Sequence, residues 1–186
     1  MAKNAYIITG PESSGSTFIS QIIAHVLGVN PEFGTNLGWN GRQFCNNLNP
    51  DETRNNDIVI LHRSQPFCKR YQYFDYQEFK TMFKGYNLYF ILTTRDPIIT
   101  AISKKSRWNV DDETIKSDNV KSSEILGTIM ENEKYFIWNY ETMLYLKNVY
   151  FNQLYKFLNV TSYFYPKVQD GNIKYIKKNK LRFITI

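Results

Sequence analysis

The sequence predicts an α/β fold, a single domain in which a central parallel sheet is flanked by helices on both faces. Short apolar runs rich in β-branched residues alternate with segments of helical spacing, which is the pattern of a parallel sheet. The apolar runs of strand length lie at residues 6–9, 57–61, 88–92 and 135–140. Because 186 residues are enough for one domain with a proper core, we assign residues 1–186 to one domain.

The first strand, Tyr6–Thr9, leads through a loop rich in Gly and Ser into a helix. Apolar residues recur with helical spacing from Phe18 to Leu27, and Gly28 is a typical helix end. A loop of this kind presents free backbone N–H groups at a helix N-terminus, where the helix dipole favours an anion. The sequence therefore predicts a phosphate-binding loop at Gly10–Thr17.

The middle of the chain predicts a long connection, a strand and a helix. Residues 29–56 are rich in Asn, Gly and Pro, and a connection of this length is expected to cover or shape a site. The apolar run Asp57–Leu61 predicts a buried strand that ends at His62-Arg63-Ser64. A helix over 75–84 follows, with Gly85 at its end.

The strand over 88–92 is followed by a helix with clear start signals. Asp96 is a good N-cap, and Pro97 suits the first helical position. The buried side of this helix is expected to contain Ile98, Ile99 and Ile102.

The last part of the chain is less regular. Residues 107–122 are polar without strong periodicity, which predicts a loop with a fragment of helix, and residues 123–130 predict a short helix. A strand over 135–140 precedes the segment 141–158, which fits one long or two short helices. The tail is turn-rich and basic, and we expect residues 161–186 to pack on or near the functional site.

Three polar groups follow predicted strands. They are the Gly10–Thr17 loop, His62-Arg63 and Arg95-Asp96. Because ligands of parallel sheets bind at the carboxyl ends of the strands, we expect these groups to form one site.

The charge balance favours an anionic ligand. The formal net charge is +6 and the sequence pI is about 9.2, which suits an anionic small molecule as well as a polymer. No nucleic-acid-binding module is recognisable, so we predict a small-molecule or carbohydrate substrate and no nucleic-acid partner. The sequence does not predict an oligomeric state.

Cysteine usage and hydropathy predict a cytoplasmic protein. Cys45 and Cys68 lack metal-ligand spacing and do not make a disulfide scaffold, so we expect free thiols in a reducing compartment. No apolar stretch approaches the length of a membrane span, and we predict no membrane association.

The loop departs from the nucleotide-binding pattern G-x-x-x-x-G-K-[ST] at its most important position. Gly10 and Gly15 fit the pattern, but Ser16 stands where the lysine belongs. A kinase or ATPase would lose its phosphate-neutralising cation, and the strands end in His and Arg and not in a magnesium-binding carboxylate. A P-loop kinase or nucleotide-binding protein remains an alternative.

The same loop resembles that of another family. Ser13-Ser14-Gly15-Ser16-Thr17 is similar to the 5′-phosphosulfate-binding loop of sulfotransferases that use 3′-phosphoadenosine 5′-phosphosulfate (PAPS). Leu92–Pro97, with Ser103 eight residues after Arg95, resembles the segment of that family that holds the 3′-phosphate. A weaker match is Trp138–Met143, which looks like the Tyr-Glu-Asp-Leu segment of that family and is followed downstream by Phe157-Leu158.

The resemblance implies a P-loop-like sulfotransferase fold and a reaction. Ser13, Ser14, Gly15, Ser16 and Thr17 would hold the 5′-phosphosulfate, and Arg95 and Ser103 would hold the 3′-phosphate. A sulfuryl group would pass from PAPS to a hydroxyl of a carbohydrate or small metabolite, without a metal, and the product would be adenosine 3′,5′-bisphosphate.

Two further residues are predicted to act in catalysis. His62 is the candidate base, because its unperturbed pKa lies near neutrality and it follows a predicted strand. The family has a basic residue where this chain has Ser13, so a substitute cation is needed. We predict that it is Arg63, while Lys104, Lys105 and Arg107 lie farther along the following helix. A degenerate protein that binds PAPS or its product without catalysis is a further alternative.

Overall fold

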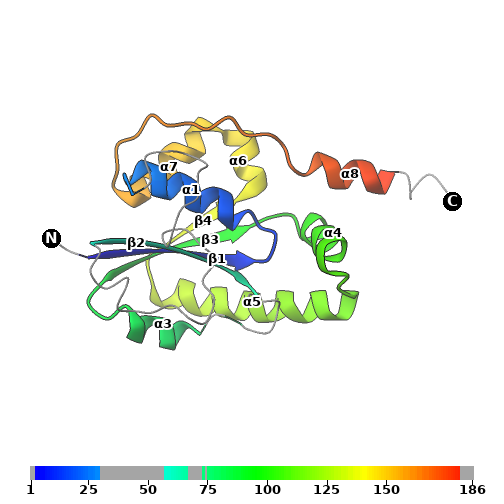
Figure 1. The fold of residues 1–186 in the computed structure, drawn as a ribbon, viewed down its shortest axis with the longest axis horizontal. Helices are drawn as coiled ribbons and strands as arrows, with labels where there is room; N and C mark the ends of the chain where they lie inside the picture. Colours follow the sequence, from blue (N-terminus) through cyan, green and yellow to red (C-terminus); the bar gives the residue numbers. More distant parts are fainter. Residues whose placement is uncertain (1–2, 30–56, 67–72, 74, 181–186) are drawn as a thin grey trace.

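The computed structural model describes residues 3–29, 57–66, 73 and 75–180. Its centre is a sheet of four parallel strands in the order β2-β1-β3-β4 (Figure 1). The strands are β1 (Asn4–Pro11), β2 (Ile58–Gln65), β3 (Asn87–Thr94) and β4 (Tyr135–Asn139). The predicted α/β class, with one parallel sheet in a single domain, is confirmed.

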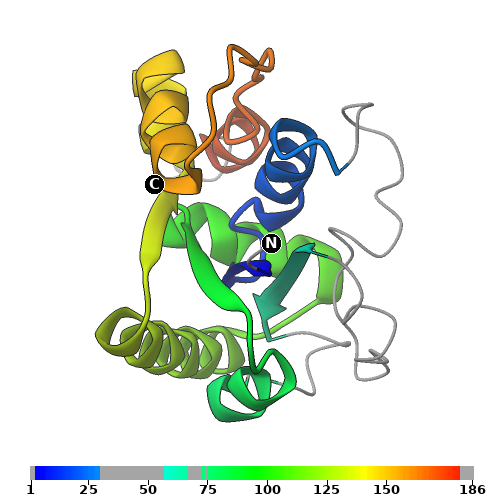
Figure 2. The ribbon, with the colours of Figure 1, turned by 90° about the vertical axis from the view of Figure 1, so that its left-hand side faces the viewer.

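Helices cover both faces of the sheet. They are α1 (Ser16–Val26), α3 (Tyr76–Met82), α4 (Pro97–Trp108), α5 (Asp112–Asn132), α6 (Tyr140–Leu146), α7 (Asn148–Leu158) and α8 (Ile173–Lys180). Figure 2 shows α1, α6 and α7 on one side of the sheet, with α3 and α5 on the other. The predicted flanking of the sheet by helices is therefore confirmed.

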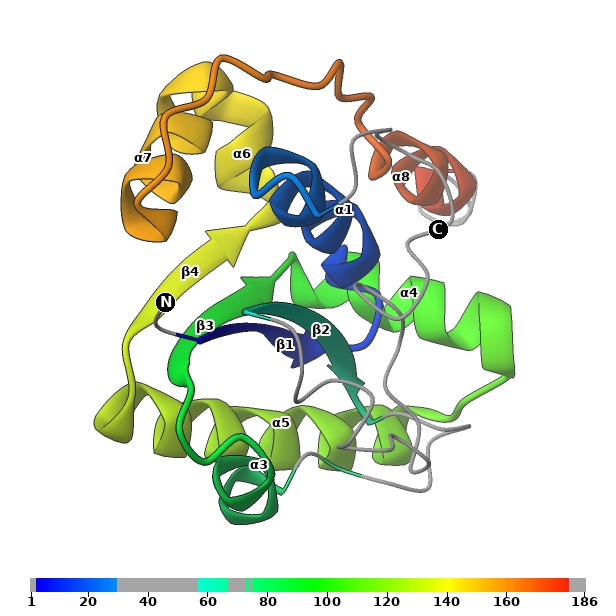
Figure 3. The ribbon, with the colours of Figure 1, turned by 60° about the vertical axis from the view of Figure 1, so that its left-hand side comes forward.

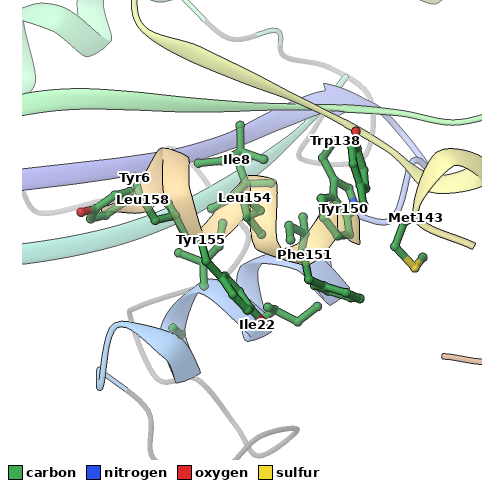
Figure 4. Packing of buried hydrophobic residues seen from close by; sticks show 14 of the residues in the cluster. Tyr6, Ile8, Ile22, Trp138, Met143, Tyr150, Phe151, Leu154, Tyr155 and Leu158 are labelled. Atoms are coloured by element: carbon green, nitrogen blue, oxygen red, sulfur yellow. The ribbon is translucent and has the colours of Figure 1, made fainter. Parts of the chain in front are cut away.

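The alternation of strand side chains divides the core into two clusters. Tyr6 and Ile8 of β1 pack in the cluster beneath α1 and α7, whereas Ala5 and Ile7 pack in the cluster above α3 and α5. Figure 4 shows the first cluster, in which Trp138 lies beside Tyr150, while Phe151 and Tyr155 extend from α7 toward α1. Trp138 is stacked on Tyr150 at a centroid distance of 5.1 Å.

The strand β2 extends beyond the end that the sequence predicts. It continues through His62, Arg63 and Ser64 to Gln65, and this stretch pairs in register with residues 8–11 of β1. Polar side chains are accommodated there because they have partners; the Gln65 Nε2 group, for example, donates to Thr9 Oγ1 at 2.8 Å. The predicted end at His62-Arg63-Ser64 is therefore too early, because this segment belongs to the strand and Gln65 ends it.

The helix α4 begins as predicted. Asp96 is its N-cap, with its carboxylate accepting from the backbone N–H groups of Ile98 and Ile99, and Pro97 is the first helical residue. One part of the expectation is wrong, since Ile98 is 68% exposed. Ile99 is buried as expected, and the buried side also contains Thr100, Ser103 and Lys104.

The predicted loop over 107–122 is wrong, because α5 is one helix of 21 residues that begins at Asp112. Its N-cap, Asp111, accepts from the Thr114 N–H at 2.7 Å. Its buried side contains Asp118 and Ser122 as well as isoleucines. These polar residues interrupt the apolar spacing from which a helix would be predicted.

The C-terminal part of the chain forms two helices where the sequence fitted one or two, and it contains a further helix, α8. Residues 140–158 form two helices, α6 and α7, which are separated at Lys147, a residue with φ of 47°. The chain then runs without regular structure until α8, which lies beside α4 (Figure 3). None of the helices in the described part of the chain is long and apolar enough to span a membrane. The connection predicted over 29–56 lies outside the described residues from residue 30 onward, as do Cys45 and Cys68.

Candidate functional site

The strand order reverses next to β1, although all four strands are parallel. The connection after β1 leads to β2 on one side, whereas the connection after β3 leads to β4 on the other. The loop after β1 and the residues after β3 therefore flank the crevice where parallel sheets bind their ligands. A hydrogen bond joins the two, because Arg95 Nη1 donates to the Ser13 carbonyl at 3.1 Å.

Close contact between β1 and β3 fixes the start of the loop. A Cβ atom on Gly10 would lie 2.1 Å from the Thr93 carbonyl oxygen, so only glycine fits there. Beyond it, Ser14 shares a hydrogen bond of 2.6 Å with the Thr93 hydroxyl. Gly15, the N-cap of α1, has a φ of 92° and provides no side-chain cap. The first backbone N–H groups of α1 are thus left without intrahelical or side-chain cap acceptors.

A cavity of about 220 Å³ lies at this edge of the sheet. Its walls come from the loop, from the carboxyl end of β2, from the residue after β3 and from the last turn of α4. The lining residues are Glu12, Ser13, Gly15, Ser16, Thr17, His62, Ser64, Arg95 and Arg107.

The two residues predicted for catalysis lie on opposite faces of β2. His62 lines the cavity together with Ser64, two positions along the strand. Arg63 lies between them, so strand alternation places it with Leu61 on the face covered by α3 and α5. Arg63 is buried, at 8% exposure, and is not among the residues that line the cavity. The structure thus brings His62, but not Arg63, to the loop.

Arg95 lines the cavity and is fixed by contacts to the rest of the protein. Its Nε atom donates to Asn172 Oδ1 at 2.8 Å, and Nη2 donates to the same oxygen. The guanidinium lies over the Tyr140 ring, 4.4 Å from the centroid. A guanidinium has about five N–H donors. Arg95 uses three of them, two for Asn172 and one for Ser13, so two remain for a ligand.

Ser103 lies on the buried side of α4 and does not line the cavity. It is fully buried, and its hydroxyl shares a hydrogen bond of 3.0 Å with the Tyr175 hydroxyl from α8. Burial acts to raise the pKa of the Tyr175 phenol, but hydrogen bonds with Ser103 and Lys174 and the charges of Lys174 and Arg107 outweigh it. The pKa of Tyr175 is consequently lowered.

We call residues 169–175 the C-terminal strap. The strap is anchored on α6, because the Gly171 N–H donates to the Tyr140 hydroxyl at 2.9 Å and Asn172 Nδ2 donates to Glu141 Oε1 at 2.8 Å. The other carboxylate oxygen of Glu141 accepts from the Asp96 N–H at 3.1 Å. The strap therefore lies against Arg95 and Ser103, the two residues predicted to hold a phosphate.

Arg107 lines the cavity, although the sequence favoured Arg63 as the substitute cation. It follows Ser103 by four residues, the spacing that places two side chains on neighbouring turns of one helix face. The sequence placed Arg107 on this helix too, but farther along it than Lys104 and Lys105, and Arg63 was preferred as the substitute cation. Glu12 and Ser64 also line the cavity, and no motif predicts them.

The chemistry of the cavity is that of an anion site. It combines the guanidinium groups of Arg95 and Arg107, the N-terminus of a helix and the imidazole of His62. In the described part of the chain, no group of three or more His, Cys, Asp or Glu side chains could hold a metal ion. Comparisons with models of protein families and with curated protein sequences found no match to this chain.

Proposed function

We propose that the protein is a sulfotransferase with a P-loop-like architecture that binds PAPS in this cavity. One observation carries the proposal: Arg95, at the end of β3, reaches the loop after β1, and both line one cavity with His62. The donor set of the cavity fits a phosphosulfate group. The acceptor is a hydroxyl of a carbohydrate or another small metabolite.

The absence of a lysine at position 16 favours PAPS over ATP. Phosphoryl transfer from ATP relies on that lysine and on magnesium held by a carboxylate. Here the residues at the strand ends that line the cavity are His62, Ser64 and Arg95. Such a set neutralises an anion directly and has no evident magnesium ligand apart from Glu12 in the loop.

Three steps fall to the chain itself. The N–H groups at the start of α1 bind the oxygens of the transferred group, and the cavity arginines neutralise the charge that develops on the leaving phosphate. His62 accepts the proton of the acceptor hydroxyl. PAPS supplies the sulfuryl group, which passes to the acceptor oxygen as its bond to the 5′-phosphate oxygen breaks and leaves the electron pair on the nucleotide.

The strap gives this proposal a structural requirement. Ser103 can contact a 3′-phosphate only if Tyr175 releases its hydroxyl, because Ser103 is fully buried against that residue. Arg95 likewise has to exchange its bonds to Asn172 for bonds to the phosphate, or use its remaining N–H groups. Binding of the nucleotide is thus coupled to the position of the C-terminal strap.

A second candidate function is nucleotide binding without catalysis. It is favoured by the loop itself, in which the Ser13 hydroxyl is buried without a hydrogen-bond partner and no lysine or arginine is present. Such a protein would bind adenosine 3′,5′-bisphosphate yet leave PAPS intact.

Calorimetry with adenosine 3′,5′-bisphosphate tests the binding step. We expect the wild type to bind, and Arg95→Ala to bind about tenfold more weakly or worse, because charge-assisted hydrogen bonds are lost. Arg95→Lys, which keeps the charge but not the planar fork, should lie between them. Thermal unfolding of each variant checks that the fold persists.

Two outcomes would contradict the proposal: no binding by the wild type, or magnesium-dependent ATP binding that does not respond to Arg95→Ala. Release of sulfate or transfer to an acceptor panel from labelled PAPS then separates the enzyme from the non-catalytic binder.

A further inference from the structure

The loop after β1 contributes no positive charge to the cavity that it borders. Ser13 and Ser16 stand at the two positions where a phosphate-binding loop would have a cation. The Ser13 hydroxyl is buried and unpartnered, and its carbonyl is already an acceptor for Arg95. The loop therefore offers N–H donors, and any full charge must come from elsewhere.

Arg95 meets this need only in part. Its guanidinium makes three hydrogen bonds within the protein, two to Asn172 and one to Ser13. It also lies over the rings of Tyr140 and Tyr175, 4.4 and 5.7 Å from their centroids. Most of its N–H donors therefore hold the loop and the strap in place and are not available to a ligand.

The C-terminal half of α4 carries three cations, and they differ in their partners. Lys104 is buried and lies 3.8 Å from Asp118 Oδ2. Lys105 forms a short ion pair of 2.6 Å with Asp112 Oδ1. Arg107 lines the cavity, and no carboxylate among the described residues lies within ion-pair distance of it.

Two further contacts fix the surroundings of Arg107. Its guanidinium lies over the Trp108 ring at 5.6 Å, which leaves the N–H groups at its edge available. Its charge is also one of the causes that lower the pKa of the Tyr175 phenol in the strap.

We propose that Arg107 is the cation of the phosphate-binding loop, supplied from the end of α4 in place of a lysine in the loop itself. It binds the 5′-phosphate of the nucleotide, where charge collects when the sulfuryl group leaves. This inference rests on the proposed function for the identity of the nucleotide. The anion contact itself requires only the cavity. Arg107 takes the role that the sequence assigned to Arg63, which lies on the other face of β2.

Calorimetry with paired ligands tests the assignment. Adenosine 3′,5′-bisphosphate carries both phosphates, adenosine 3′-monophosphate lacks the 5′-phosphate, and inorganic pyrophosphate lacks the nucleoside. We expect Arg107→Ala to weaken binding of the bisphosphate and of pyrophosphate about tenfold, and to leave the 3′-monophosphate within about twofold. Arg107→Lys should weaken them by about threefold, because the charge remains without the fork.

Lys105→Ala is the matched control. It removes a charge two residues away that is bound to Asp112, so binding of all three ligands should stay within about twofold. Unchanged bisphosphate affinity in Arg107→Ala would overturn the inference and leave the proposed function standing. Pyrophosphate binding that depends on Arg107, in a protein that does not bind the bisphosphate, would overturn the proposed function and leave the inference about Arg107 standing. A wild type that binds none of the three would overturn both.

Discussion

The cavity has two sides that are built differently. On the loop side, the N-terminus of α1 is uncapped and Arg107 has no carboxylate partner among the described residues. On the side of β3, Arg95, which lines the cavity, and Ser103, which does not, are engaged by the side chains of Asn172 and Tyr175 from the strap. On the loop side, an anion can bind Arg107 without replacing a carboxylate of the described residues. On the side of β3, an anion has to replace the side chains of Asn172 and Tyr175.

This difference changes what each side contributes to affinity. An intramolecular hydrogen bond contributes about 0.5–1.5 kcal/mol net, so replacing those of the strap removes part of the gain from a 3′-phosphate. On the loop side, Arg107 has no carboxylate partner among the described residues, so its contact with an anion needs no such exchange. A nucleotide with two phosphates is therefore expected to gain most of its affinity from the 5′-phosphate. The affinity gained from the 3′-phosphate is expected to depend on the hydrogen bonds of the strap that it replaces.

The largest effect is expected where the two sides meet, at Gly10. Gly10→Ala would put a methyl group 2.1 Å from the Thr93 carbonyl oxygen, so β1 and β3 would have to separate. We expect a loss of about 3 kcal/mol in the free energy of unfolding, and loss of nucleotide binding on both sides of the cavity. Urea unfolding and calorimetry measure the two effects.

Gly127→Ala is the control for that substitution. No heavy atom lies within 4 Å of a Cβ built at this position in α5, and alanine favours the helix by about 0.5–1 kcal/mol. Equal stability of the two alanine variants would contradict the close contact between β1 and β3.

A smaller effect is expected from Asn172→Ala, which removes the acceptor of Arg95 and the anchor to Glu141. Because the substitution leaves a charged donor and a carboxylate without their partner, we expect a loss of about 1–3 kcal/mol in the free energy of unfolding. Gln153→Ala, at an exposed position of α7, should change it by less than about 0.5 kcal/mol. If both variants are equally stable, the strap is not held by these bonds.

The smallest effect, and the most specific, is expected from Tyr175→Phe. The ring remains but the hydroxyl that bonds Ser103 is lost, so a 3′-phosphate can displace residue 175 from Ser103 without breaking that hydrogen bond. We expect adenosine 3′,5′-bisphosphate to bind about threefold to fivefold more tightly, with no change for adenosine 5′-monophosphate. Tyr163→Phe, at a position that is 86% exposed, should change neither affinity. Weaker bisphosphate binding in Tyr175→Phe would mean that the strap belongs to the binding surface and does not compete with the ligand.

Local patterns in the sequence were sufficient to predict the loop side of the site. Glycines 10 and 15, the apolar run before them and the helical spacing after them are all within one short stretch. The N-cap and first residue of α4 were equally local, and both predictions are confirmed.

The other features depend on contacts that are remote in sequence. Whether His62 or Arg63 lies toward the cavity is decided by the register between β1 and β2, since successive strand residues face opposite sides. Ser103 and Tyr175 are 72 residues apart, and no pattern links them. The N-terminal half of α5 was missed because Asp118, on its buried side, is held by the remote Lys104 and by Tyr73.

A structure of the protein with adenosine 3′,5′-bisphosphate is the most direct test of the central claim. We expect the 5′-phosphate against the N–H groups of Gly15–Thr17 with Arg107 in contact, and the 3′-phosphate on Arg95 with Tyr175 displaced from Ser103. A nucleotide bound away from this cavity, or a cavity without nucleotide at a saturating concentration, would contradict the account.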